Sequence, residues 1–295
     1  MLESLINPKK AERRPWEMFF IGLLYSAVAI LLADLLFLNN AVLSKYVSIF
    51  IILFTVMFSL PFMYYLIKRE EKRDEVIFDE KRLLKGHGRA LLALLFLFLG
   101  FVVTFSVSYL VLPAEWSAAN SRSSLEAFCM VNSPSDIDGC VTNYVQGKFI
   151  EGDITTNSIG NGMSRVGSIL SNNFYVLINC IIFSFLFGAG AIFILAWNAS
   201  VIATAIGIFA KQSQLHIAGG FLRYLVHGLP EIAGYFVAAM AGGIIGVAII
   251  RHRFEKKKFW NVLKDSLDLI ILAILILIIA SFMEVFITPL FINLL

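Results

Sequence analysis

The chain has 295 residues, of which 59% are hydrophobic and only 15% are charged. Its mean hydropathy is +0.81, and a domain of this length would not stay dissolved at that value, so the sequence predicts an all-α polytopic membrane protein. The formal net charge of +3 does not indicate a nucleic-acid partner, because the basic residues gather beside apolar segments. Three cysteines are too few for a thiolate metal cluster or a disulfide scaffold.

The N-terminal part of the chain predicts three membrane helices and a charged arm. Residues 1–16 are polar and basic, and the apolar run that follows is about 20 residues long, so it spans the bilayer and is not a cleavable signal. Asp34 lies near the far end of this run, where we expect its carboxylate to reach water. Residues 1–112 form the first predicted domain, with a cytoplasmic arm at 68–89. Opposite charges recur three or four residues apart in this arm, which predicts a solvated helical hairpin. The predicted spans cover residues 17–37, 46–67 and 90–112.

Lys and Arg are concentrated in three stretches that border apolar segments. These stretches hold 18 of the 24 basic residues: four in 1–16, eight in 68–89 and six in 251–264. Cytoplasmic loops are enriched in basic residues, so all three stretches, and with them the N-terminus, are predicted to be cytoplasmic. The segment 113–173 has three basic and six acidic residues and follows an odd number of crossings, so it is predicted to be an extracytoplasmic loop.

Cys129 and Cys140 both lie in this predicted outer loop, which is rich in Ser, Asn and Gly. Extracytoplasmic compartments are oxidising, so the two thiols can close a disulfide ring that stabilises the loop by about 2–3 kcal/mol. Two free thiols are the alternative.

The stretch 172–246 contains polar residues inside segments that are otherwise apolar enough for the bilayer. Asn198, His227 and Glu231 stand out, because an unpartnered charge or amide in hydrocarbon costs several kcal/mol. In one interpretation, Glu231 caps its own helix and pairs with His227. In the other, these three residues and Glu284 of the last span form a proton or cation site. One His and two carboxylates fall short of any zinc motif, so we predict no metal site and no catalytic residue.

The number of crossings after the outer loop must be odd if the chain is to reach the basic stretch at 251–264. One solution is a single long span followed by a re-entrant hairpin that breaks at residues 227–230. The other solution is three spans, with a helix broken near Asn198. We therefore expect six or seven transmembrane helices, including broken or re-entrant ones near residues 198 and 228, a last helix at 266–294 and an extracytoplasmic C-terminus. The three spans would cover residues 174–195, 198–210 and 230–250.

Small residues recur at every fourth position after Glu231 and form one stripe on the predicted helix. Such a stripe is typical of a face where a second helix crosses at close range, either within the subunit or across a dimer. A pair of glycines in the preceding apolar segment is interpreted in the same way. The stripe consists of Gly234, Ala238, Gly242 and Gly246, and the pair is Gly188 and Gly190.

These residues together resemble the stage II sporulation protein M family over roughly residues 165–290. The resemblance is carried by Asn172-Asn173, Phe187-Gly188-x-Gly190, Asn198, His227-Gly228-Leu229-Pro230-Glu231, Leu263-Lys-Asp-Ser-Leu267 and Glu284-Val-Phe-Ile-Thr-Pro289. It implies that residues 174–295 form the membrane core of the family. It also implies that the signature positions are Asn198, His227, Gly228, Glu231 and Glu284.

In spore-forming bacteria, this family supplies the membrane subunit of an engulfment complex that holds two peptidoglycan-degrading partners, and the subunit itself is not regarded as the hydrolase. Distant members occur in archaea and in bacteria that do not sporulate. This chain resembles the distant members, because it has two additional N-terminal helices and a Ser/Asn-rich outer loop. The resemblance implies a membrane scaffold or assembly subunit for extracytoplasmic envelope proteins, without a catalytic domain of its own.

The alternative function is a small transporter or channel whose site is the polar core. Hydration separates the two, since a scaffold needs its polar residues sealed in packing, whereas a transporter needs a water path and a second state. The partners that we expect are the lipid bilayer and either further copies of the chain in a homo-oligomer or other membrane or envelope proteins. We expect no nucleic acid and no cofactor.

Overall fold

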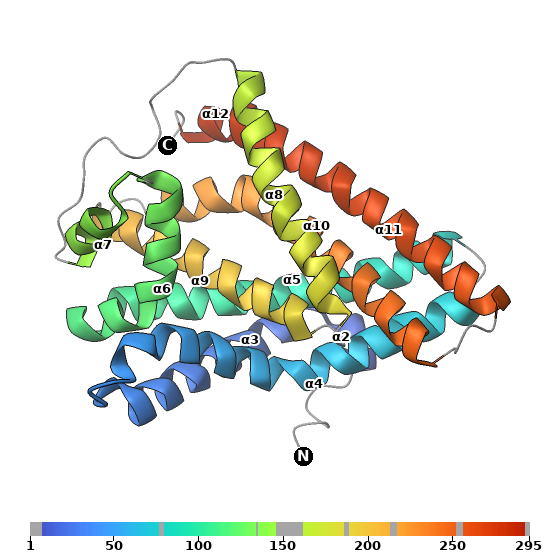
Figure 1. Cartoon of the computed structure of the whole chain (residues 1–295), viewed down its shortest axis with the longest axis horizontal. Helices are drawn as coiled ribbons and strands as arrows, with labels where there is room; N and C mark the ends of the chain where they lie inside the picture. The colour runs from blue at the N-terminus through green and yellow to red at the C-terminus, as the bar shows by residue number, and fades with distance from the viewer. Residues whose placement is uncertain are drawn as a thin grey trace.

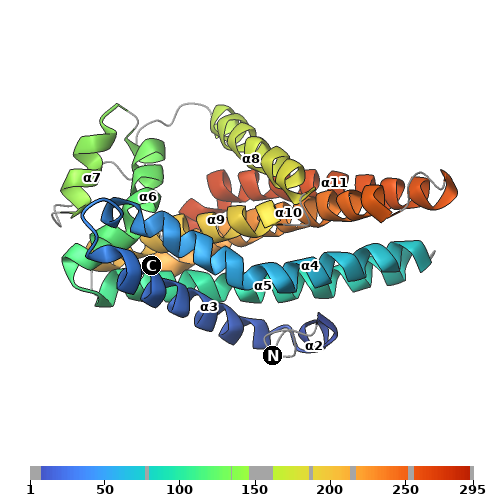
Figure 2. The same ribbon diagram turned by 60° about the horizontal axis from the view of Figure 1, so that its bottom comes forward.

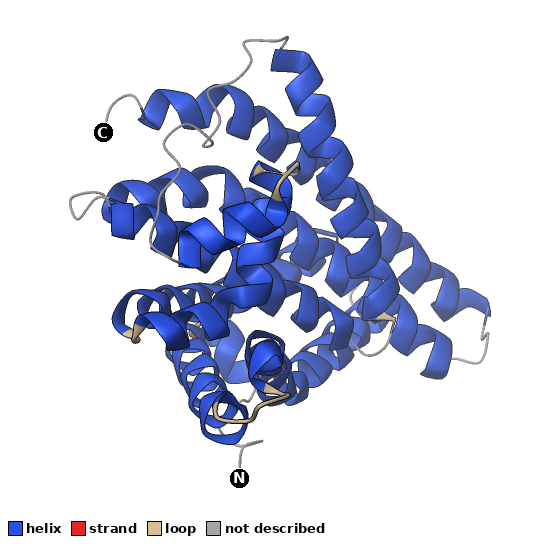
Figure 3. Ribbon diagram, turned by 60° about the vertical axis from the view of Figure 1, so that its left-hand side comes forward, coloured by secondary structure: helices blue, strands red, loops and turns tan. Residues whose placement is uncertain are grey.

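The structure, a computed structural model, describes residues 8–76, 80–133, 135–145, 162–185, 189–212, 217–251 and 256–292. The regular structure within these ranges is entirely helical (Figure 3). Seven helices in the described part of the chain are long and apolar enough to cross a membrane, which is the larger of the two predicted numbers. The predicted fold class, an all-α polytopic membrane protein, is confirmed.

The seven spans follow one another along the chain with short helices between and beside them. The spans are built by α3 (Glu17–Ala33) with the π-helical η1 (Asp34–Leu38), α4 (Val47–Val76), α5 (Glu80–Val111), α8 (Gly162–Ser184), α9 (Ala189–Gln212), α10 (Ile217–Arg251), and α11 (Lys256–Phe282) with the π-helical η3 (Met283–Ile287). The remaining elements are α2 (Pro8–Arg13), η2 (Ser44–Tyr46), α6 (Ala114–Asn132), α7 (Ile137–Val145) and α12 (Thr288–Ile292).

Helix α10 lies at the centre of the bundle and contacts α8, α9, α11 and α4 (Figure 1). In the apolar stretch of α10 that can span a membrane, 89% of the residues are buried, whereas 22% of the residues are buried in the corresponding stretch of α8. Ala238, Ala239 and Ala241 of α10 are completely buried. Small side chains let neighbouring helices approach closely, and a helix that is apolar all round is one that is covered on every face.

The glycines of α10 mark where α8 crosses it. A Cβ atom on Gly242 would lie 2.6 Å from the carbonyl oxygen of Ile181, and one on Gly246 would lie 2.7 Å from that of Phe185. Both oxygens belong to the backbone at the end of α8, so the two helices meet backbone to backbone and do so within one chain.

The other small residues of the predicted stripe have different neighbours. A Cβ atom on Gly234 would meet Leu277 of α11 at 3.0 Å, and Ala238 is fully buried. A spacing of four exceeds one helical turn of 3.6 residues, so the stripe winds around α10 and faces first one neighbour and then another. Gly190 lies in α9, and Gly188 falls outside the described residues.

Helices α9 and α10 run without interruption through the positions where the sequence predicted broken or re-entrant helices, near residues 198 and 228. That prediction is wrong. The side-chain amide of Asn198 donates to the carbonyl oxygen of Ile194 at 2.7 Å, so the helix itself satisfies this group. Pro230 lies inside α10, where it removes one backbone hydrogen bond from a helix that is held by packing on all sides. The helical interruption in this part of the chain falls instead between Ser184, where α8 ends, and Ala189, where α9 begins.

The predicted outer loop, 113–173, contains the two helices α6 and α7, and its last residues already belong to α8, which begins at Gly162. Cys129 and Cys140 form a disulfide that joins α6 to α7, with 5.9 Å between their Cα atoms. We call these two helices and their disulfide the α6–α7 pair. Helix α6 packs on α9 and α4 at the end of the bundle.

The α6–α7 pair lies at one end of the bundle, and the C-terminal ends of α4 and α10 lie at the other, as do the N-terminal ends of α5 and α11 (Figure 2). The basic stretches 68–89 and 251–264 include these helix ends. The more acidic and the basic segments are therefore at opposite ends, as the predicted topology requires. Which side of the membrane each end faces stays a prediction.

Candidate functional site

Glu231 is the centre of a hydrogen-bonded cluster that joins α10 to α8. The side-chain amide of Asn173 donates to Glu231 Oε1 at 2.6 Å. The hydroxyl of Tyr235 donates to Oδ1 of the same Asn173 at 2.9 Å. Glu231 and Tyr235 are four residues apart, so they share one face of α10, and Asn173 bridges them from α8.

Glu284 extends this cluster to the end of the last span. It lies in η3, which packs against both α8 and α10, and its carboxyl group shares a hydrogen bond with that of Glu231. An ionised carboxylate can only accept, so one of the two groups must carry the proton of this bond. Arg165 of α8 is close enough to Glu284 for an electrostatic interaction with its carboxyl group.

The other two residues of the predicted polar core are placed differently. Asn198 is on α9, and its amide N–H bonds to Ile194 of its own helix. His227 lies one turn before Glu231 on α10, and its side chain lies outside the described part of the structure. Gly228, a third signature position, faces α9, where Ile202 is 3.9 Å from the place of a Cβ atom.

Two residues of the cluster, Asn173 and Tyr235, were not among the four residues of the predicted polar core. Asn173 is 5% exposed and Tyr235 is 3% exposed. Asn173 lies at the end of the predicted outer loop, 113–173, whereas in the structure it belongs to α8, which begins at Gly162. A tyrosine four residues after an intramembrane carboxylate is the signal that could have identified Tyr235, because the i and i+4 positions share a helix face.

The cluster can act chemically in two ways. As a structural clamp, it gives each polar group a partner inside the membrane, where water is not available to supply one. As a proton site, the two carboxyl groups can hold and release the single proton between them. In either role it joins α8, α10 and the end of the last span.

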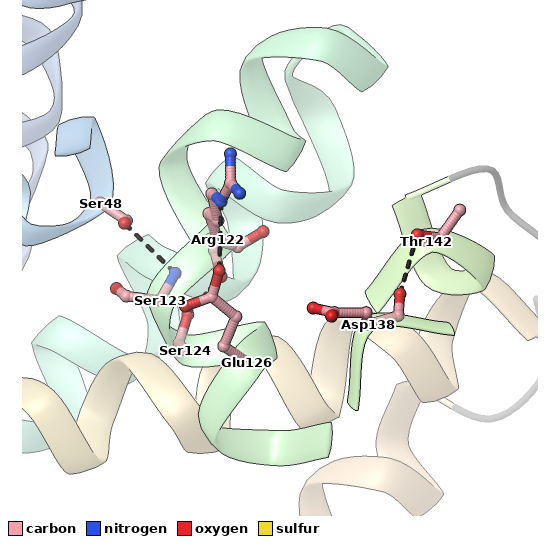
Figure 4. Close-up of polar contacts among 8 residues, drawn as sticks. Ser48, Arg122, Ser123, Ser124, Glu126, Asp138 and Thr142 are labelled. Carbon is pink, nitrogen blue, oxygen red and sulfur yellow. Dashed lines mark hydrogen bonds and ion pairs between the residues drawn. The ribbon is translucent and has the colours of Figure 1, made fainter. Parts of the chain in front are cut away.

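A second polar region fixes α6 to the bundle. The hydroxyl groups of Ser124 and of Thr204 on α9 are 2.8 Å apart and share a hydrogen bond. The backbone N–H of Ser123 donates to Ser48 Oγ of α4 at 3.2 Å (Figure 4). The hydroxyl of Ser117 donates to a backbone carbonyl of α5 at 2.9 Å. The Ser-rich composition that suggested a loop belongs instead to the inner face of a helix.

A cavity of about 590 Å³ opens at the α6–α7 pair. Its walls come from α6, α7 and the turn between η1 and α4, and they include Lys45, Trp116 and Arg122. Trp116 is 43% exposed, and Arg122 pairs with Glu126 at 3.1 Å (Figure 4). An exposed aromatic ring among polar and charged side chains is typical of a surface that binds another protein. We call this cavity the α6–α7 groove.

The family model described as Stage II sporulation protein M matches residues 90–289. An uncharacterized protein of Methanocaldococcus jannaschii is 30% identical over 138 residues, which cover 45% of this chain and 76% of that protein. No solved structure matches the chain. The matched range is wider than the residues 165–290 that carry the sequence motifs, and it includes the α6–α7 pair.

Proposed function

Since the chain belongs to the stage II sporulation protein M family, we propose that it is an integral membrane scaffold that holds extracytoplasmic envelope proteins through its α6–α7 pair. The observation that carries this proposal is the α6–α7 groove, which has about 590 Å³ of space and an exposed tryptophan in its wall. A scaffold needs a binding surface on the side where its partners are. The predicted topology puts the α6–α7 pair on that side.

The rigidity of the α6–α7 pair supports its use as a binding surface. The disulfide between Cys129 and Cys140 ties the two helices together. Buried hydrogen bonds from Ser123 and Ser124 fix α6 to α4 and α9. A surface that is already ordered loses less conformational entropy when a partner binds, so its contacts contribute more to affinity.

A small transporter or channel is the second candidate, and the carboxyl contact between Glu231 and Glu284 favours it. We prefer the scaffold because Asn173 and Tyr235 complete the hydrogen bonds of this cluster within the protein. Polar groups that satisfy one another in this way suit a sealed core, whereas a transport site must exchange its partners for water or an ion during each cycle.

Cross-linking in living cells tests the scaffold at the groove. A photoreactive phenylalanine analogue at Val141, which lines the α6–α7 groove, should form adducts with proteins that carry an export signal or an extracytoplasmic domain. The same analogue at Leu35 is the matched control, because this apolar residue of η1 is 79% exposed and is not part of the groove. Adducts at Val141 with cytoplasmic proteins alone, or none above the Leu35 background, would contradict the proposal.

A further inference from the structure

Polar side chains in several spans are covered by a neighbouring helix. Asp34, in the first span, is only 7% exposed, so the expectation that it reaches water is wrong, because Asn120 of α6 contacts it and donates to its Oδ2 atom at 3.1 Å. Asn173 of α8 is equally buried, and its amide bonds to Glu231 of α10. The hydrocarbon core of a membrane contains no water, so protein has to supply the partners of such groups.

The outward side of α8 differs from this pattern, because polar and small residues are exposed along it. These residues follow one another at spacings that place them on one side of the helix, opposite the side that packs on α10. Helix α8 also has the lowest mean hydropathy of the seven candidate spans. We call this side the α8 outer face, and it consists of Ser164, Gly167, Ser171, Tyr175, Ile178 and Asn179.

The centre of the α8 outer face lies in the middle of the span. Helix α8 runs along the outside of the bundle (Figure 2), and Ser171 and Tyr175 are each about 13 Å from the nearer end of the helix at 1.5 Å per residue. Tyr175 is 68% exposed. Between described residues, no hydrogen bond engages the hydroxyl groups of Ser171 and Tyr175. Lipid chains cannot provide one.

Gly167 leaves space for a second helix on this face. A Cβ atom at Gly167 would meet nothing within 4 Å, whereas the corresponding space at Gly100 and Gly242 is occupied by the backbone of a crossing helix. A hollow of about 470 Å³ lies at the same place and is lined by Gly167, Ser171 and Tyr175 among other residues of α8. Small residues four positions apart, such as Gly167 and Ser171, let two membrane helices approach closely.

We propose that a second copy of this chain packs on the α8 outer face, helix against helix, in a two-fold symmetric dimer. Two copies enter the membrane in the same orientation, so the two-fold axis runs along the membrane normal and each residue near it meets its own counterpart. Such a face has to be complementary to itself. The hydroxyl groups of Ser171 and Tyr175 both donate and accept hydrogen bonds, and the α8 outer face contains no charged residue that would repel its copy.

The other occupants fit this face less well. Lipid alone would leave the two central hydroxyl groups without partners. A different membrane protein would need a matching polar stripe of its own, whereas a second copy always carries one. The α8 outer face belongs to another helix than the α6–α7 pair, and this inference does not rest on the proposed function.

Oxidative cross-linking of the full chain in its native membrane tests the dimer. Ile178→Cys should give a disulfide-linked dimer with copper phenanthroline, because the axis brings position 178 close to its copy. Ile271→Cys is the matched control and should remain monomeric, because Ile271 is a comparably exposed isoleucine on α11. The native cysteines give little background, since two form a disulfide and the third is buried.

Three results of this experiment would overturn the proposal. Equal yields from Ile178→Cys and Ile271→Cys would mean random collision in the membrane. A cross-link from Ile178→Cys to a different protein would mean a heterologous partner. An absence of any product would mean that lipid covers the α8 outer face.

Two further variants test the packing itself. Gly167→Leu should abolish the cross-link through Ile178→Cys while the helical content measured by circular dichroism stays unchanged, because this position is open within the subunit. Leucine is used because alanine is itself small enough for such a face. Tyr175→Phe removes only a hydroxyl and should raise the dimer dissociation constant in lipid vesicles about threefold, and it decides the matter if Gly167→Leu does not fold. Wild-type association in either folded variant overturns the proposal.

Discussion

Asn173 donates a hydrogen bond of 2.6 Å to Glu231 although the two residues are 58 positions apart. Oδ1 of the same amide accepts from Tyr235 at 2.9 Å, so α10 engages both ends of the Asn173 side chain. The same two helices also meet in a second, apolar contact, where Gly242 and Gly246 of α10 pack against the end of α8. The peripheral helix α8 is thus held on the central helix at two places, by hydrogen bonds in one and by close backbone packing in the other.

The Asn173→Ala variant tests the first of these contacts. It leaves Glu231 Oε1 and the Tyr235 hydroxyl without this partner, and each buried unsatisfied group costs about 1–3 kcal/mol of unfolding free energy. The neighbouring Asn172 is exposed on α8, so Asn172→Ala should change stability by less than about 0.5 kcal/mol. Chemical denaturation in detergent measures both values. Equal losses in the two variants would mean that the bridge contributes nothing.

Substitution of Glu231 separates a structural role from an ionic one. Glu231→Gln keeps a side-chain oxygen that accepts from Asn173, so it should be mild, whereas Glu231→Leu should lose about 1–3 kcal/mol for each partner left unsatisfied. Both variants are measured for unfolding free energy and for proton and cation flux in proteoliposomes. If wild type carries a flux that Glu231→Gln abolishes at unchanged stability, the transporter is correct and the scaffold is not.

The arrangement of spans was the most predictable feature of the fold. The predicted first span begins at Glu17, the residue at which α3 begins, because the change from polar to apolar sequence coincides with the edge of the bilayer. The helical hairpin predicted for the charged arm agrees with α4, which extends to Val76, and with α5, which begins at Glu80. Opposite charges three or four residues apart favour a helix that continues beyond the apolar stretch.

The candidate site was predicted only in part. The hypothesis that Glu231 and Glu284 belong together agrees with their shared hydrogen bond, since two carboxyl groups in lipid need partners. The sequence could not reveal that Asn198 bonds to its own helix, because an amide satisfied four residues back and an amide that reaches another helix look identical in sequence. Pro230, which predicted a break, lies inside the continuous helix α10. Whether a proline breaks a membrane helix depends on the packing around it.

The contact of α8 with α10 is tested at Gly242. A methyl group there would lie 2.6 Å from a backbone oxygen of Ile181, and backbone cannot move aside as a side chain can, so Gly242→Ala should destabilise the fold by about 1–3 kcal/mol. Gly167→Ala is the control in α8, because a Cβ atom at that position meets nothing within 4 Å. It should be neutral or should stabilise by up to about 1 kcal/mol. A stable Gly242→Ala variant would show that the two helices are not in backbone contact.

The disulfide of the α6–α7 pair should make stability depend on redox conditions. Reduction of Cys129–Cys140 releases a short ring, and we expect it to lower the unfolding free energy by about 2–3 kcal/mol. Cys129→Ser should melt like the reduced wild type and should not respond to reductant. Cys180→Ser should keep the response, because Cys180 is a free, buried thiol of α8. Unfolding with and without dithiothreitol measures all three proteins, and an unchanged wild type would exclude a stabilising role for the bond.

The orientation of the chain in the membrane decides whether the α6–α7 groove can hold an extracytoplasmic protein. The 18 basic residues of the three stretches predict that the α4–α5 end is cytoplasmic and the α6–α7 pair is outside. The native cysteines give little background, because two form a disulfide and the third is buried. Thr142→Cys on α7 should therefore react with a membrane-impermeant maleimide in intact cells, and Lys72→Cys on α4 should react only after permeabilisation.

Seven spans place the two ends of the chain on opposite sides, so Pro289→Cys should behave like Thr142→Cys. If Lys72→Cys alone were labelled in intact cells, the true topology would be the inverse of the predicted one. The α6–α7 groove would then face the cytoplasm, where it could not hold an envelope protein.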